Sequence, residues 1–151
     1  MFVPVYEPYL NGNEKRYVND CLDTNWISSR GKYVGLFEQK FAEYTGAAHA
    51  VAVSNGTVAI HLALAALGIG PGDEVLVPTL TYIASVNPIA YLGATPVFVD
   101  STVGNWQMDL DDLEKKITKK TKAVVAVHLY GNVCDMDRLT SICRNHHLLL
   151  V

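Results

Sequence analysis

The sequence predicts a layered α/β protein with a mostly parallel sheet. From His49 onward, five short apolar runs alternate with four helical stretches. The runs lack alternating polar residues, which is typical of strands buried on both faces of a parallel sheet. Strands that alternate with helices along the chain form the pattern of layered α/β folds. The predicted strands are residues 49–53, 74–78, 95–100, 122–131 and 148–151, and the predicted helices are residues 57–68, 81–93, 110–117 and 137–147.

The first 48 residues have a different pattern, so we expect two regions, 1–48 and 49–151. Residues 14–24 and 31–46 each place apolar side chains on one helical face, and Gly46 follows the second stretch as a stop signal. Between them lies the polar loop NWISSRG, which is rich in small residues and does not resemble a core segment.

Composition excludes several classes of protein. Among the 151 residues, 50% are hydrophobic and 18% are charged, with a net charge of −3, so neither disorder nor nucleic-acid binding is favoured. No apolar run is long enough to span a membrane, and the first residues, MFVPVYEPYL, do not resemble a secretory leader, so a cytoplasmic protein is expected. Three irregularly spaced cysteines argue against a disulfide framework. Cys143 lies near His146 and His147, but without a CxxC pair metal binding is disfavoured.

The segment Ser54-Asn55-Gly56-Thr57 is the sharpest chemical feature. It joins a predicted buried strand to an apolar helix, where free backbone N–H groups and the helix dipole favour an anion such as phosphate. A plain helix N-cap is the alternative interpretation. A P-loop is absent, and the glycines of residues 68–72 follow a helix and precede a strand, opposite to a dinucleotide fingerprint. A nucleotide-binding α/β domain of another kind therefore lacks the motif it would need.

Two further candidates end predicted strands at the same sheet edge. Tyr82 follows residues 74–78 and could stack on a flat ring or simply pack. His128 lies near the end of residues 122–131 and is either a site residue or a hydrogen-bonded structural histidine. Because ligands of open parallel sheets bind at the carboxyl ends of the strands, their convergence predicts a pocket there.

Together these segments resemble the DegT/DnrJ/EryC1/StrS family of pyridoxal-phosphate (PLP)-dependent sugar aminotransferases, especially its perosamine-forming members. The matching segments include NWISSRGKYVGLFEQKFAEYTG, VAVSNGT, PTLTYIASVN and AVHLYGNVCDMD. The resemblance implies the large domain of a three-layer, fold-type-I PLP enzyme that forms a homodimer. It implies that Asn55, Gly56 and Thr57 bind the cofactor phosphate and that Tyr82 stacks on the pyridine ring. It also implies a substrate-binding role for the loop residues Trp26, Ser28, Ser29 and Arg30.

The resemblance further implies amino transfer from glutamate to a 4-keto-6-deoxy sugar nucleotide, for O-antigen or other polysaccharide synthesis. We expect the chain to be cut within its fifth strand, since LLLV has no turn or cap after it. The family's catalytic lysine and its acidic partner are expected beyond Val151, so the chain alone is expected to be inactive. Two alternatives stay open: a sugar dehydratase of the same family, which has histidine in place of that lysine, and a non-catalytic fragment or binding module.

Overall fold

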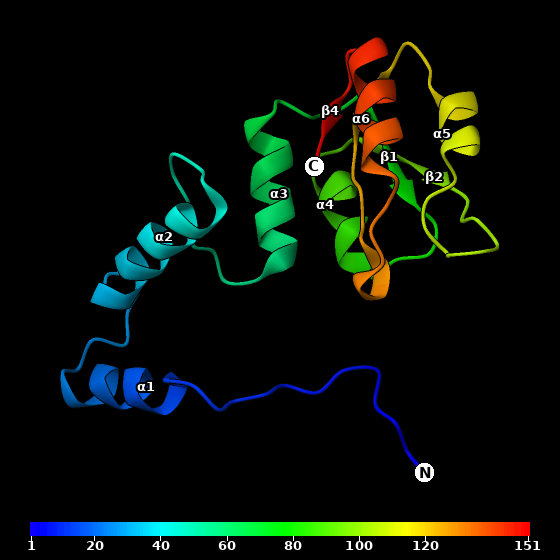
Figure 1. Cartoon of the computed structure of the whole chain (residues 1–151). Coiled ribbons are helices and arrows are strands. Elements are labelled where there is room, and N and C mark those ends of the chain that lie inside the picture. Colours follow the sequence, from blue (N-terminus) through cyan, green and yellow to red (C-terminus); the bar gives the residue numbers. More distant parts are fainter. The chain divides into compact units, whose positions relative to one another are not determined.

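The computed structural model describes residues 1–151, which form two compact units, Met1–Ala52 and Val53–Val151 (Figure 1). No helix in it is both long and apolar enough to cross a membrane.

The first unit consists of two helices, α1 (Glu14–Asp23) and α2 (Lys32–Thr45). The predicted stop after α2 is confirmed, because Gly46 adopts a left-handed φ of 72° and its N–H bonds to the Ala42 carbonyl. No side chain of either helix is buried. Contacts between the helices are made by Lys32 Nζ, 2.6 Å from Asp20 Oδ2, and by the rings of Tyr17 and Tyr33, whose centroids are 4.9 Å apart.

The second unit contains a four-stranded, all-parallel sheet in the order β2-β1-β3-β4. The strands are β1 (Glu74–Pro78), β2 (Thr95–Val99), β3 (Thr121–Val124) and β4 (Leu149–Leu150). The helices are α3 (Gly56–Ala66), α4 (Asn87–Tyr91), α5 (Leu110–Lys116) and α6 (Met136–Asn145), with short 3₁₀ turns η1 (Ile83–Ser85) and η2 (Leu129–Gly131). The predicted α/β class and parallel sheet are confirmed.

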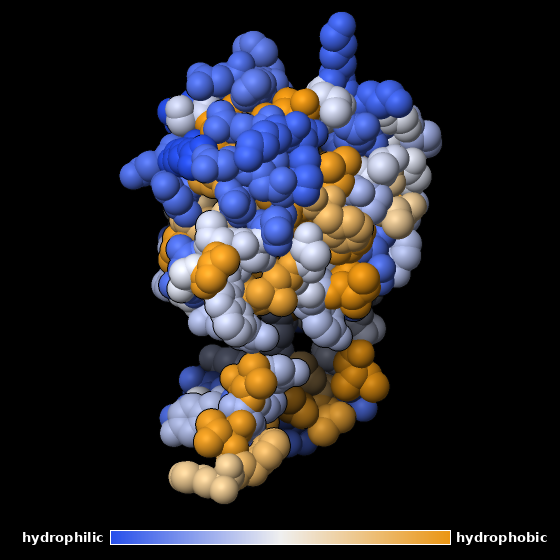
Figure 2. Space-filling view, turned by 90° about the vertical axis from the view of Figure 1, so that its right-hand side faces the viewer, coloured by the Kyte–Doolittle hydropathy of each residue, from blue (hydrophilic) through white to orange (hydrophobic).

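Two apolar cores lie on opposite faces of this sheet, which makes the unit three-layered. Val75 and Val77 of β1 pack with α3 and with Ile89 of α4. Leu76, between them in the sequence, points to the other face and packs with α5 and α6 through residues such as Leu113. Strands buried on both faces have no polar side, which explains their continuous apolar sequences. The exposed side of α5 is largely hydrophilic (Figure 2).

Chain handedness explains which helix covers which face. The chain runs from β1 outward to β2, crosses back over β1 to β3 and continues to β4. Crossovers between parallel strands are right-handed in nearly all proteins, so connections in opposite directions place their helices on opposite faces. Accordingly α4 covers one face, and α5 and α6 cover the other. Adjacent strands followed by helices on opposite faces form a topological switch point, where open α/β sheets bind ligands.

One predicted strand is absent from this structure, and the strand predicted over residues 122–131 is shorter, since β3 ends at Val124 and residues 129–131 form η2. Residues 49–53 form no strand, so the sheet has four strands rather than five. Ala52 N–H instead donates to Glu38 Oε1 at 2.8 Å, and Val51 is exposed. The apolar sequence alone does not make a strand, because its backbone groups also need a neighbouring strand, and none in the chain pairs with them.

Candidate functional site

The N-terminus of α3 combines a helix cap with free backbone donors. Asn55 is the N-cap in extended conformation, and its side-chain oxygen accepts the Val58 N–H at 3.0 Å. The first backbone bond of the helix runs from Ala59 N–H to the Asn55 carbonyl at 3.1 Å. The N–H groups of Gly56 and Thr57 have no partner in the chain. The cap interpretation and the anion-site interpretation are therefore compatible, since the cap uses only one donor.

The space beside these donors is open. A Cβ built on Gly56 meets no atom of the chain within 4 Å. The Thr57 hydroxyl makes no hydrogen bond within the chain, so it is available as a third donor. Backbone donors at the positive end of a helix, a free hydroxyl and open space together fit a phosphate group.

Tyr82 lies beyond the carboxyl end of β1. Thr79 fixes the start of this loop, because its N–H and Oγ1 both donate to the Val99 carbonyl, at 2.8 and 3.0 Å. Tyr82 then caps η1, its carbonyl accepts the Ser85 N–H at 2.9 Å, and the residue is 77% exposed. α3 packs against η1 and runs opposite to β1, so its N-terminus faces the same edge of the sheet. An exposed aromatic ring held by a short helical turn is free to stack on a ligand.

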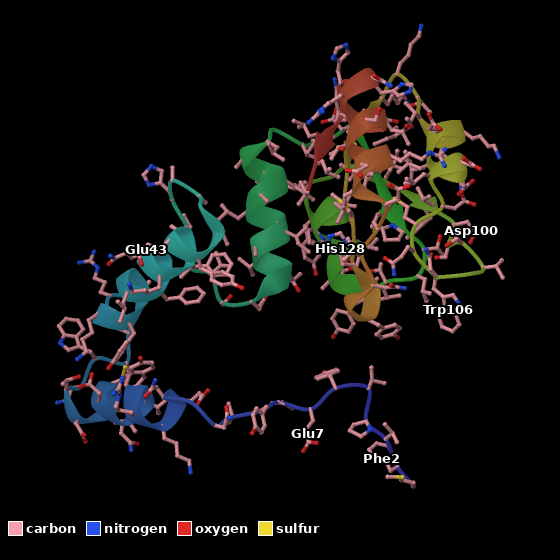
Figure 3. The ribbon with its side chains drawn as sticks, viewed as in Figure 1. Phe2, Glu7, Glu43, Asp100, Trp106 and His128 are labelled. Atoms are coloured by element: carbon pink, nitrogen blue, oxygen red, sulfur yellow. The ribbon has the colours of Figure 1, made fainter.

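His128 ends the chain segment that continues from β3. Its Nδ1 accepts the Cys134 N–H at 3.3 Å, which is what a structural histidine would do. The following turn has left-handed backbone at Tyr130 (φ 55°) and Gly131 (φ 81°). Figure 3 labels His128 at this edge. The hydrogen bond leaves one ring nitrogen of His128 free.

The four predicted substrate-binding residues lie in the other unit. Trp26, Ser28, Ser29 and Arg30 are all exposed in the loop between α1 and α2, and the Arg30 N–H donates to Ser28 Oγ at 3.4 Å. Asn55, Gly56, Thr57 and Tyr82 belong to the second unit. A shared site between the two sets stays a prediction.

Sequence reasoning did not single out residues 104–107, which with residues 129–132 line a hollow at this edge of the sheet. No group of three or more His, Cys, Asp or Glu side chains is placed to hold a metal ion.

Comparison with known proteins identifies the class. Residues 8–151 match the sequence model of the DegT/DnrJ/EryC1/StrS aminotransferase family, so the chain belongs to this family. More particularly, it is 59% identical over 150 residues to GDP-perosamine synthase of Escherichia coli O157:H7, covering 99% of this chain and 41% of that protein. The chain thus spans about two fifths of the length of this relative.

Solved structures agree with the fold. An aminotransferase from Psychrobacter cryohalolentis superposes with a TM-score of 0.88 at 38% identity, over 95% of this chain and 36% of that one. E. coli GDP-4-keto-6-deoxy-D-mannose-3-dehydratase with bound hydrated PLP superposes with a TM-score of 0.87 at 29% identity, over 97% of this chain and 39% of that one. An aminotransferase and a dehydratase therefore both share this architecture.

Proposed function

We propose that the chain provides the phosphate-binding helix and the ring-stacking edge of a PLP-dependent nucleotide-sugar aminotransferase. The complete protein transfers an amino group from glutamate to the keto carbon of a 4-keto-6-deoxy sugar nucleotide of the perosamine type. One observation carries the proposal: the free Gly56 and Thr57 N–H groups face open space at the edge of the sheet, in a chain 59% identical to a GDP-perosamine synthase.

The residues at the N-terminus of α3 divide the work of holding the cofactor. Gly56 and Thr57 donate backbone N–H groups to the phosphate, and the Thr57 hydroxyl adds a further donor. Asn55 keeps the helix end ordered by capping Val58. Tyr82 stacks against the pyridine ring, and its exposure supports this role. When bound, PLP supplies the electron sink that makes exchange of an amino group possible.

The cofactor also needs a lysine, and the lysines of the second unit are poorly placed to supply it. Three of the chain's lysines lie on α1 and α2 in the first unit. The others lie in the last turn of α5 and around the start of β3, whereas Tyr82 follows the carboxyl end of the neighbouring strand β1. Lys116 is already bonded to Asp112 and to the Phe98 carbonyl. We therefore assign the catalytic lysine and its acidic partner to other residues of the complete protein, without which this chain is inactive.

The remaining parts of the proposal concern assembly and context. Trp26, Ser28, Ser29 and Arg30 contact the sugar nucleotide, and a region boundary between residues 48 and 49 separates this loop from the cofactor-binding part. The complete protein works as a cytoplasmic homodimer in synthesis of O-antigen or a related polysaccharide. The names of the matched relatives support the sugar-nucleotide chemistry.

A sugar dehydratase is the second candidate, because such an enzyme superposes with a TM-score of 0.87. Its sequence identity of 29% is about half the 59% found with the perosamine synthase, which favours the aminotransferase.

The deciding experiment follows the amino nitrogen. The complete protein is incubated with PLP, GDP-4-keto-6-deoxymannose and glutamate labelled isotopically at its amino nitrogen. Label in the sugar nucleotide, with an equal amount of 2-oxoglutarate, is the expected result. A sugar product that has lost a hydroxyl and carries no label would establish the dehydratase. A product unchanged from the substrate would overturn both.

A further inference from the structure

We propose that Thr81 and Ser85 are positioning residues, which hold Tyr82 where its ring can stack on the cofactor. Thr81 Oγ1 and Ser85 Oγ are 3.0 Å apart, and either hydroxyl can donate to the other. These two side chains, here called the hydroxyl pair, lie on either side of Tyr82 in the sequence. The inference rests on the proposed function, which assigns the Tyr82 ring to the pyridine ring of PLP.

The hydroxyl pair closes the short turn that begins at Tyr82. The backbone bond of this turn runs from the Ser85 N–H to the Tyr82 carbonyl at 2.9 Å. Hydrogen bonds of 3₁₀ turns have poorer geometry than those of an α-helix, and η1 is only three residues long. The bond between the Thr81 and Ser85 side chains spans the same turn a second time. It therefore restricts the backbone of Tyr82 more firmly than the turn alone.

Ser85 anchors the hydroxyl pair in the core. It is one of three buried polar residues of the chain and is 7% exposed. Thr81 Oγ1 is the one partner of its hydroxyl within the chain, and a buried hydroxyl that loses its partner is costly. The next residue, Val86, belongs to the apolar core beneath α3 and α4. One end of the pair is thus fixed by the core, and the other end lies next to Tyr82.

Little else in the chain holds the Tyr82 ring. The residue is 77% exposed, and its hydroxyl makes no hydrogen bond within the chain. A ring without packed neighbours takes its position from the backbone that carries it. The position of this ring therefore depends on the turn that the hydroxyl pair closes.

The same turn sets the distance from the ring to the phosphate donors. η1 packs against α3 and α4, which lie side by side (Figure 1). The N-terminus of α3 carries the free N–H groups of Gly56 and Thr57. Phosphate and pyridine ring belong to one small molecule, so Tyr82 has to lie at a fixed distance from these donors. Binding groups are held at such distances by the hydrogen bonds of residues behind them.

Removing either hydroxyl from the complete protein tests the inference, with the Kd of PLP and of pyridoxal measured by absorbance titration. Ser85→Ala and Thr81→Val should each raise both constants about threefold, less than the loss of about tenfold expected when the whole ring is removed. Thr81→Ser keeps the hydroxyl and should restore both constants. Thr140→Val is the matched control, because it removes a hydroxyl that donates to the Met136 carbonyl of α6 at 2.6 Å and should change neither constant.

The same substitutions made together with Tyr82→Ala separate positioning from a general loss of structure. Because the hydroxyl pair acts through the Tyr82 ring, Ser85→Ala should change neither constant once the ring is absent. If Ser85→Ala does not fold, Thr81→Val decides, since Thr81 is only half-buried.

Three results would overturn the inference. The first is no weakening while the ring is present, and the second is an equal weakening with and without the ring. The third is a loss confined to PLP, which would place the effect at the phosphate. In all three cases the stacking role of Tyr82 stands if Tyr82→Ala weakens binding by itself. If Tyr82→Ala left both constants unchanged, the stacking role in the proposed function would fail together with the inference.

Discussion

Replacing Asn55 by aspartate should separate the two roles of the α3 N-terminus. The Asn55 oxygen accepts the Val58 N–H at 3.0 Å, and an aspartate oxygen can accept the same bond. Its negative charge also interacts favourably with the helix dipole, by about 0.3–1 kcal/mol. The free energy of unfolding of the cofactor-free protein should therefore stay the same or rise slightly. Asn55→Ala, which loses the cap, should instead lower it by about 1 kcal/mol.

The same charge should repel a bound phosphate. Two unit charges about 5 Å apart interact by about 3 kcal/mol at an effective dielectric constant of about 20. The Kd of PLP should then rise about a hundredfold in Asn55→Asp. Pyridoxal, which has no phosphate, is the matched probe, and its Kd should not change. Both constants can be measured from the absorbance of the complete protein during titration. Equal weakening of PLP and pyridoxal would refute the assignment of phosphate to this helix end.

Three further perturbations test the core, the charges and the ring contact. Leu113→Ala should lower the free energy of unfolding by about 2–5 kcal/mol in urea titrations, because Leu113 is fully buried; a loss below about 1 kcal/mol would contradict its packing. The Asp100 N–H, and to a smaller extent Lys116, hold the pKa of the Asp112 carboxyl below its usual value. The ionised carboxyl therefore stabilises the fold at pH values above the pKa it has in the unfolded chain, and this stabilisation is lost as the pH falls through the pKa it has in the folded protein. Asp112→Asn should thus lose less stability than the parent protein between about pH 7 and about pH 3, and parallel pH profiles would contradict this. Tyr82→Phe should keep PLP affinity, whereas Tyr82→Ala should weaken it about tenfold; equal affinities would exclude stacking.

The sheet could be predicted from the sequence to the extent that burial on both faces leaves a local signal. β1 matches its predicted run because it is buried nearly throughout, and the edge strand β2 matches its run although Thr95 and Phe98 are exposed. Residues 49–53 show the limit of that reasoning. Their composition is as apolar as that of β1, yet they form no strand, since strand formation depends on a neighbour that the local sequence cannot reveal.

The N-terminus of α3 and the hollow lined by residues 104–107 and 129–132 also differ in how far the sequence alone could predict them. The α3 site was predictable because cap, glycine and hydroxyl are consecutive, so one short segment contains the whole signal. The hollow lined by residues 104–107 and 129–132 could not be predicted from the sequence. Its two walls are more than 20 residues apart in the chain, and they meet only because of the strand order β2-β1-β3. The left-handed backbone of Trp106 was not predictable either, since the neighbouring Asn105 is the residue that would favour this conformation.

Gly56→Ala tests the α3 site without any change of charge. Gly56 is the first residue of α3 and its backbone is not left-handed, so alanine fits its conformation and has the higher helix propensity. The added Cβ meets no atom of the chain within 4 Å, so the fold should keep its stability or gain a few tenths of a kcal/mol. The same methyl group would occupy the open space beside the free N–H groups and should weaken PLP binding while leaving pyridoxal unaffected. We therefore expect Gly56→Ala to keep or raise the stability of the fold and to lower the affinity for PLP. This combination is expected when a glycine is needed for ligand binding rather than for the fold. If Gly56→Ala left the Kd of PLP unchanged, the open space beside α3 would not be where the phosphate binds.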